Sequence, residues 1–389
     1  MPEQSIVFYI FVIFTGAAVL ATLALYARQA LPVAYIVLGG LLGPWGFALV
    51  DDAALIEDIA HVGIIFLLFL LGLDLYPQKL IQLLRQTTIV TVASAVVFAA
   101  LGYSVAMAFG LGTAESVVIG VATMFSSTII GIKLLPTTIL HHRHTGEVVI
   151  SVLLLQDVVA IVILLVLHGI GRGTATVGDV VMLLAALPAM VLLGIGIERY
   201  VLFPLFRRFD RIQEYVFLLT VGWCLGMAQI AQWIGLSYEI GAFIAGVAVA
   251  ANPIARHIAD SLKPLRDFFL VMFFFALGAG FDMNVAQSIW LPATTLAVLV
   301  LLVKPVVFRF LLVTVAETKQ LAWEIGVRLG QLSEFSLLIS FLALESGLVT
   351  AQAAYCVQLA TILTLIGSSY LIVLRYPTPV AVSDRLRRD

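Results

Sequence analysis

Three ionisable side chains, Asp157, Lys304 and Glu334, lie deep inside long apolar stretches of this sequence. The hydroxyl-bearing run Ser126–Thr128 lies equally deep inside another stretch. Because a helix rises about 1.5 Å per residue, all four positions fall near the middle of a hydrocarbon layer about 30 Å thick. An ionisable group at that depth costs at least about 2.5–3.5 kcal/mol, and apolar packing would align helices more cheaply. The pattern therefore favours a functional site over a polar network that only fixes helix packing.

The balance of charge among these groups predicts the chemistry of the site. If Lys304 pairs with Glu334, their charges neutralise each other and Asp157 has no formal partner. A buried carboxylate without a partner must hold a proton or a cation, because a desolvated and uncompensated charge is too costly. Protons and cations would then compete for Asp157, and such competition is the chemistry of proton–cation exchange.

The composition requires that membrane-spanning helices position these groups. Of the 389 residues, 62% are hydrophobic and 11% are charged, whereas soluble domains average roughly 45–50% and 25%. No polar stretch between the apolar runs is long enough for a soluble domain of about 50 residues. The sequence therefore predicts an all-α integral membrane protein.

Thirteen apolar stretches are predicted as transmembrane helices. Residues 1–375 then form a single polytopic membrane domain, and residues 376–389 form a short basic cytoplasmic tail. Met1–Gln4 lacks the basic residues of a signal peptide, so the first stretch is counted as a span. The predicted spans are 5–26, 31–49, 59–75, 88–110, 115–136, 148–169, 177–200, 212–233, 238–252, 266–281, 287–314, 323–346 and 352–375.

The distribution of Lys and Arg predicts the orientation of these spans. The chain has 21 Lys and Arg residues, of which Lys133, Lys304, Arg309 and Arg328 lie within spans. With the N-terminus outside, all the others fall in cytoplasmic loops or the tail except Arg172, which lies outside. Basic residues collect on the cytoplasmic side of membrane proteins. The sequence therefore predicts a multi-pass protein of the inner (plasma) membrane with its C-terminus in the cytoplasm.

An internal repeat relates the two halves of the chain. The end of the third span, Phe66–Asp74, is similar to the end of the tenth, Phe273–Asp282, and Phe125–Thr128 of the fifth is similar to Leu332–Ser336 of the twelfth. Both pairs are seven spans apart. An odd offset makes the second copy cross the membrane in the opposite sense, which is the inverted-repeat plan of many secondary transporters.

Several other classes of protein are excluded by what the sequence lacks. The dipeptide Gly-Lys does not occur, so there is no phosphate-binding P-loop for an ATP-driven pump. A net charge of −2 with scattered basic residues gives no nucleic-acid-binding stripe. Cys224 and Cys356 both lie inside apolar runs and form no disulfide framework. We expect a transporter with no cofactor apart from its transported ions, and not an enzyme.

The remaining ionisable groups near the spans have simpler interpretations. Glu239, Arg309 and Lys133 lie close enough to the ends of their spans for the side chains to reach water. The His-containing run 141–144 is expected in a solvated cytoplasmic turn rather than in a metal site.

Motifs along the chain resemble one family. The sequence is similar to the membrane domain of the Kef-type branch of the monovalent cation:proton antiporter-2 family over roughly residues 32–374. The Gln156–Asp157 pair within its apolar context is the most specific element of this resemblance. The motifs that carry it are Gly43–Gly46, Leu71–Leu80, Ser126–Thr128, Leu153–Ile161, Gly235–Gly246, the stretch around Lys304, and Gly330–Phe335.

The resemblance implies a sodium/proton antiporter-like fold of about thirteen helices in two bundles, one for dimerisation and one forming a core. Spans five and twelve would be interrupted helices that cross at the ion site, and the protein would be a homodimer. Asp157 would carry the monovalent cation and the proton, and Gln156 would be a neutral co-ligand. Lys304, Glu334 and Ser333 would play supporting electrostatic roles.

Two features depart from the Kef pattern. Glu239 stands where an apolar residue is expected, and a second titrating group on the ion path could add a proton to the exchange. Kef proteins usually continue into a nucleotide-binding regulatory domain, and this sequence does not contain one. Either the antiporter is naturally short, or a regulatory cytoplasmic domain or subunit is missing from this chain.

The leading hypothesis for function is exchange of potassium for protons by alternating access. An amide beside one carboxylate offers a weaker field than two adjacent carboxylates, which favours the more easily dehydrated potassium ion. Ser126, Ser127 and Thr128, with backbone carbonyls, would complete the oxygen shell. A sodium/proton antiporter of the same fold, a gated potassium efflux channel and a structural membrane subunit are the alternatives.

Overall fold

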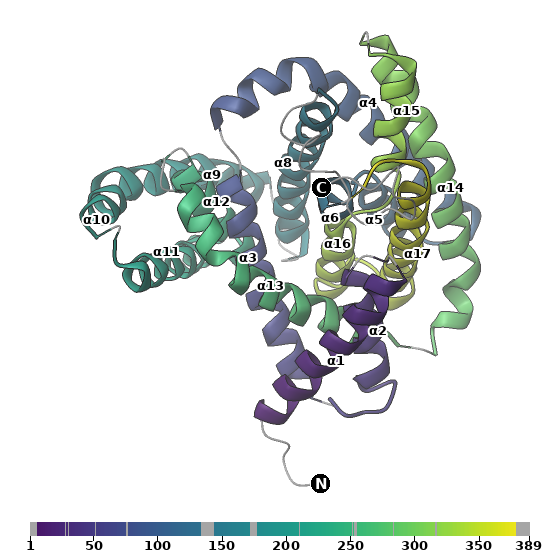
Figure 1. Ribbon diagram of the computed structural model, residues 1–389, viewed down its shortest axis with the longest axis horizontal. Coiled ribbons are helices and arrows are strands. Elements are labelled where there is room, and N and C mark those ends of the chain that lie inside the picture. The colour runs from purple at the N-terminus through teal and green to yellow at the C-terminus, as the bar shows by residue number, and fades with distance from the viewer. Residues whose placement is uncertain are drawn as a thin grey trace. The chain divides into compact units, whose positions relative to one another are not determined.

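The computed structural model describes residues 6–378 apart from residues 28, 30, 51, 75–76, 134–143, 172–176, 210, 251, 253–254, 283 and 316. Every regular element in this part of the chain is a helix (Figure 1). The helices are α1 (Ile6–Tyr26), α2 (Leu31–Leu42), α3 (Ala53–Asp74), α4 (Pro77–Ala108), α5 (Thr113–Thr123), α6 (Thr128–Lys133), α8 (His144–Gly171), α9 (Val177–Ile197), the π-helical turn η1 (Glu198–Leu202), α10 (Phe203–Phe209), α11 (Gln213–Trp233), α12 (Tyr238–Ala250), α13 (Ala255–Ala279), α14 (Ala286–Thr314), α15 (Lys319–Arg328), α16 (Glu334–Glu345) and α17 (Ala351–Arg375).

The predicted all-helical membrane fold is confirmed, because each predicted span coincides with a helix or with a helix that is broken in two. Six of the described helices are long and apolar enough to cross a membrane by themselves. Shorter apolar helices include α2, α5 and α12. The exact number of thirteen spans stays a prediction.

Two helices begin well before the apolar stretches that predicted them. The span predicted from residue 88 is the end of α4, which starts at Pro77, and the span predicted from residue 266 is the end of α13, which starts at Ala255. Pro77 is suited to the first helical position, where its missing N–H has no intrahelical partner to lose. Hydropathy detects the part of a helix that lies in lipid, so it misses polar turns that continue the same helix.

The fifth and twelfth predicted spans are interrupted, as the resemblance implied. The first break lies between Thr123, where α5 ends, and Thr128, where α6 begins. The second lies between Arg328, where α15 ends, and Glu334, where α16 begins. Each break exposes backbone N–H and C=O groups that a continuous helix would have paired internally.

The chain forms two compact units, each built from separate parts of the sequence. Unit 1 comprises residues 1–20, 35–81 and 168–281, and unit 2 comprises residues 21–34, 82–167 and 282–389. Both interrupted helices, together with α8, α14 and α17, belong to unit 2. In Figure 1, α5, α6, α16 and α17 lie together within this unit.

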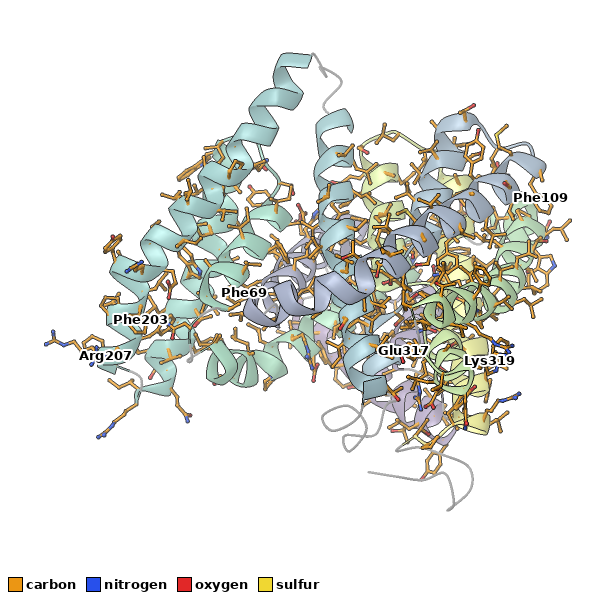
Figure 2. All side chains as sticks on the ribbon, turned by 90° about the horizontal axis from the view of Figure 1, so that it is seen from above. Phe69, Phe109, Phe203, Arg207, Glu317 and Lys319 are labelled. Carbon is orange, nitrogen blue, oxygen red and sulfur yellow. The ribbon has the colours of Figure 1, made fainter. Side chains whose placement is uncertain are left out.

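Unit 1 is held together by close packing of α3 against α12 and α13. Gly72 of α3 and Gly246 of α12 face each other so closely that a Cβ at either position would overlap the backbone of the other helix. The rings of Phe66 and Phe269 stack with centroids 4.8 Å apart. Small residues at helix contacts allow such close approach in membrane proteins. Figure 2 shows Arg207 near the end of α10 extending away from the helices of this unit, in a segment that the sequence analysis predicts to be cytoplasmic.

Unit 2 is organised around α14, which packs against α15 and α17. Gly326 of α15 lies against Pro305 of α14, and a Cβ on Gly326 would come within 2.6 Å of the Pro305 carbonyl oxygen. An apolar cluster that includes Phe98 of α4 and Phe308 of α14 lies at this contact. The close approach of α15 to α14 places the residue before Pro305, Lys304, near the second break.

Candidate functional site

Serine side chains cap the helices that restart after each break. Ser127 Oγ accepts a hydrogen bond from the Ile130 N–H at 3.1 Å at the start of α6. Ser333 Oγ accepts one from the Phe335 N–H at 3.1 Å at the start of α16. Serine favours such positions because its hydroxyl satisfies a backbone donor that has no partner within the helix. The serine-rich sequence at both breaks therefore explains how each helix can restart.

The two breaks contact each other through side chains that bond to the opposite segment. Ser126 Oγ donates to the Leu329 carbonyl at 2.8 Å, and Ser127 Oγ donates to Glu334 Oε1 at 2.7 Å. From the second segment, Ser336 Oγ donates to the Ala122 carbonyl at 2.6 Å. The interrupted helices thus meet at their breaks, as the fold implied by the resemblance requires.

Gln156 of α8 holds the first break in place. Its Oε1 accepts the Ser126 N–H at 3.0 Å, and its Nε2 donates to the Met124 carbonyl at 3.4 Å. The side-chain amide replaces backbone partners that the broken helix has lost. Gln156 therefore fixes the chain directly beside the next residue of α8, Asp157.

Asp157 is the buried carboxyl group of the site. Only 2% of its surface is exposed, and its Oδ2 atom makes no hydrogen bond within the described structure. The Thr128 hydroxyl and the Glu334 carboxylate act on it electrostatically. The Thr128 hydroxyl lies beside Asp157, and its oxygen is likewise buried without a hydrogen-bond partner in the described structure. Buried polar atoms are nearly always satisfied, so this carboxyl is suited to holding a proton or a cation.

The expected ion pair between Lys304 and Glu334 is wrong. Lys304 is fully buried, and its Nζ donates to the backbone carbonyls of Phe125 at 2.6 Å and Gln331 at 3.1 Å. It also lies 5.0 Å from the centroid of the Phe98 ring. The physical reason is the pair of breaks, because unpaired carbonyls near helix C-termini carry partial negative charge that attracts a cation.

Glu334 instead occupies the first turn of α16. Its two carboxylate oxygens accept hydrogen bonds from Ser127 Oγ at 2.7 Å and Ser333 Oγ at 3.2 Å. A carboxylate is favoured at a helix N-terminus, where backbone N–H groups carry partial positive charge. Each charged side chain therefore compensates the ends of the broken helices rather than the other side chain.

The structure brings the predicted site residues together within unit 2. Among them, Thr128 and Glu334 act on Asp157, Gln156 and Lys304 bind the segments, and Ser126, Ser127 and Ser333 join or cap them. Glu239 belongs to unit 1, where it begins α12 with 6% of its surface exposed. Most of the side chain is therefore buried, and the expectation that its carboxylate reaches water stays a prediction.

Two other predictions about charged residues have different outcomes. Arg309 is exposed and its guanidinium lies 5.4 Å from the centroid of the Trp323 ring, in agreement with a side chain that reaches an interface. The run 141–143 and the side chain of Lys133 lie outside the described part of the structure.

Three polar residues of the site were missed or left without a role in the sequence analysis. Gln331 is fully buried and its Nε2 donates to the carbonyls of Arg328 at 3.0 Å and Ser127 at 3.4 Å. Thr364 and Ser368 of α17 bind the same segment. Thr361, Thr364 and Ser368 are separated by three and four residues, so they form a polar stripe on one face of the helix. This stripe is the sequence signal that could have indicated a role for α17 in the site.

The fold and the site define a class of protein: a polytopic membrane protein in which two broken helices of opposite halves cross beside a buried carboxyl group. Residues 10–375 match the sequence profile of the family described as "Sodium/hydrogen exchanger, transmembrane". The chain belongs to this family.

Curated relatives agree with that assignment. A glutathione-regulated potassium-efflux system protein KefC from Cronobacter sakazakii is 29% identical over 371 residues, which are 92% of this chain and 58% of the relative. The chain thus spans little more than half the length of such relatives. An iron transporter, MagA, from Paramagnetospirillum magneticum is 28% identical over 354 residues, or 88% of this chain and 79% of the relative. The predicted Kef-type relationship is confirmed by these matches.

A solved structure has the same fold. The sodium proton antiporter MjNhaP1 from Methanocaldococcus jannaschii, determined at pH 8, superposes with a TM-score of 0.69 at 15% identity. The match covers 93% of this chain and 94% of that one. At this identity the comparison supports the antiporter-like fold and leaves the choice of cation open.

Proposed function

We propose that this chain is a secondary transporter that exchanges a monovalent cation, potassium in preference to sodium, for protons. The observation that carries the proposal is the buried Asp157 carboxyl, whose Oδ2 has no hydrogen-bond partner in the described structure. A proton or a desolvated cation would satisfy this atom, and binding of one excludes the other. Thr128 would supply a hydroxyl oxygen to the same ion.

The surroundings of Asp157 support this assignment. Ser127 and Ser333 donate to Glu334, which stabilises its negative charge, and two carbonyls bind the Lys304 ammonium. Both groups would keep their charge while Asp157 alternates between proton and cation. Potassium is proposed because the residue beside Asp157 in the sequence is the amide Gln156 and not a second carboxylate, while the Glu334 carboxylate is held by two serine hydroxyls. The KefC relatives, named for potassium efflux, agree with this choice.

Sodium is the second candidate, since MjNhaP1 is a sodium proton antiporter with the same fold. Iron, which the name of the MagA relative suggests, is less well supported. Among the described residues there is no group of three or more His, Cys, Asp or Glu side chains that could hold a metal ion. A site of one carboxylate with hydroxyl, amide and carbonyl oxygens suits a hard monovalent cation better than iron.

The wider setting completes the proposal. The protein would be a homodimer in the inner (plasma) membrane. Its N-terminus would lie outside, because the Lys and Arg residues between spans are predicted almost entirely on the cytoplasmic side. A regulatory domain or subunit would act on it from the cytoplasm, since the KefC relatives extend well beyond the region that this chain matches.

The test is transport by purified protein in proteoliposomes loaded with a pH-sensitive dye, with potassium, sodium and lithium added in turn. We expect a cation gradient to drive proton movement in the wild-type protein. Asp157→Asn should abolish it, because the amide keeps the shape of the side chain but cannot exchange a proton. Asp267→Asn is the matched control, because Asp267 is an exposed carboxylate paired with Arg266.

Two results would contradict the proposal. Near-normal proton-coupled flux in Asp157→Asn would remove this residue from the mechanism. Potassium flux without proton movement in sealed vesicles would indicate the channel alternative.

A further inference from the structure

The two breaks are held by equivalent contacts from two helices that are seven spans apart. At the first, the Ser126 N–H donates to Gln156 Oε1 of α8 at 3.0 Å. At the second, the Leu332 N–H donates to Thr364 Oγ1 of α17 at 3.1 Å. Ser126 and Leu332 each stand two residues before the helix that restarts, α6 or α16. The inverted repeat therefore makes Thr364 the counterpart of Gln156.

Thr364 is built into this position. It is fully buried, and its hydroxyl donates to the Thr361 carbonyl at 2.9 Å while it accepts the Leu332 N–H. The hydroxyl hydrogen is thereby directed along α17, which leaves a lone pair for the broken segment. Loss of this hydroxyl would leave a buried backbone N–H without its acceptor.

One turn further along α17, Ser368 makes a second contact with the same segment. Its Oγ donates to Gln331 Oε1 at 2.9 Å, and both residues are fully buried. The Gln331 amide nitrogen then donates to the carbonyls of Arg328 and Ser127. Ser127, whose backbone carbonyl accepts from Gln331, also donates through its hydroxyl to Glu334, so it links α17 to the carboxylate that acts on Asp157.

We infer that Thr364 and Ser368 are positioning residues, which hold the segment 329–333 in the register that the cation site requires. The inference rests on the proposed function and extends it to a helix that carries no ion ligand. Asp157 of α8 follows Gln156, and Leu365 of α17 follows Thr364. The repeat thus has a positioning group at both equivalent positions, Gln156 and Thr364. The next residue is a carboxyl group only in α8, where it is Asp157.

The experiment compares two threonines of the same buried stripe. Thr364→Val removes the contact with Leu332, whereas Thr361→Val removes a hydroxyl that bonds at 2.8 Å to the carbonyl of Val357 in its own helix. Thr364→Ser keeps the hydroxyl and is the conservative rescue. The measured quantities are the half-saturation constant for potassium and the maximal rate in the dye assay, together with amide hydrogen exchange at residues 329–333.

We expect Thr364→Val to raise the half-saturation constant about threefold to tenfold, the equivalent of one net hydrogen bond, with little change in maximal rate. Hydrogen exchange at residues 329–333 should become faster. Thr364→Ser should restore both quantities, and Thr361→Val should resemble the wild type. Equal half-saturation constants in Thr364→Val and Thr361→Val would overturn the inference, as would an effect on maximal rate alone.

A second pair of variants tests the inference if Thr364→Val does not fold. Ser368→Ala removes the other contact, and its control is Ser340→Ala, where a buried hydroxyl bonds at 2.8 Å to the Leu337 carbonyl of its own helix. Ser368→Ala should raise the half-saturation constant, and a value equal to that of Ser340→Ala would overturn the inference. A wild-type protein that exchanges no cation would instead refute the proposed function, on which the inference depends.

Discussion

At the scale of single residues, the charges of the site are organised by broken backbone. Lys304 binds carbonyls of the two segments, and Glu334 stands in the first turn of a helix with hydroxyl donors on both oxygens. The partial charges at helix ends thus take the place of the ion pair that formal charge alone would suggest. The buried Lys304 and the half-buried Glu334 are therefore each compensated without the other.

This arrangement predicts weak energetic coupling between Lys304 and Glu334. Lys304→Met should lower stability by about 3 kcal/mol or more, because it removes two hydrogen bonds from a charged donor. Glu334→Gln in the same protein should not relieve that loss, since the two side chains do not bond to each other. A double-mutant cycle from thermal unfolding in detergent measures the coupling, which we expect below about 1 kcal/mol. A double variant much more stable than the sum of the single changes would show that the charges are paired after all.

The sequence could predict the depth of these side chains but not their partners. Position along an apolar stretch places Asp157, Lys304 and Glu334 near mid-membrane. The acceptors of Lys304 are backbone carbonyls, which every residue has, and they become available only where helices break and meet. No residue pattern distinguishes these carbonyls from those of a continuous helix.

At the scale of elements, the position of α15 depends on its close approach to α14. A Cβ on Gly326 would come within 2.6 Å of the Pro305 carbonyl oxygen. Because this contact is with backbone, a rotation of neighbouring side chains cannot remove the overlap. The approach sets where α15 ends and hence where the second segment meets Lys304. Packing of the helices is therefore part of the geometry of the site.

Gly326→Ala should consequently shift α15 and weaken both folding and exchange. Overpacking of this kind costs about 1–3 kcal/mol. Gly222→Ala in α11 is the matched control, because a Cβ there meets nothing within 4 Å, and the change should be neutral or slightly stabilising. Unfolding temperature and transport rate of the two purified variants check the prediction, and similar behaviour of both would contradict it.

Much of the element-level architecture could be predicted, since apolar length locates helices and the family resemblance implies interruptions in the fifth and twelfth spans. The role of α17 could not. Its polar residues Thr361, Thr364 and Ser368 recur at helical spacing, but periodicity shows only that they share a face. Which neighbour that face contacts depends on tertiary packing, and a backbone N–H such as that of Leu332 has no signature in the sequence.

At the scale of the whole molecule, the residues that we propose to bind the cation all belong to unit 2, while Glu239 lies in unit 1. Each unit is assembled from segments far apart in the chain, as an inverted repeat requires. Among the described residues near the crossing, Asp157, Glu334 and Lys304 are formally charged, and Arg328 at the end of α15 forms an ion pair with Glu324. The number of these groups that change protonation during the cycle determines the electrical character of transport.

One proton should therefore be exchanged for one potassium ion. Glu334 is stabilised in its ionised form by two hydroxyl donors, and Lys304 in its charged form by two carbonyls. Under the proposed function, Asp157 would carry either a proton or a monovalent cation, so the same net charge would move in each half of the cycle. Exchange should be electroneutral and its rate insensitive to membrane potential.

Proteoliposomes with and without an imposed potential test this stoichiometry, with Glu239→Gln as the companion variant. Wild-type exchange that responds to voltage would contradict one-for-one exchange. If Glu239→Gln then removed the voltage response, the extra proton would be assigned to the buried carboxyl of unit 1. The same vesicles measure ion choice, and a half-saturation constant lower for sodium than for potassium would contradict the selectivity that we derive from a single carboxylate beside the Gln156 amide.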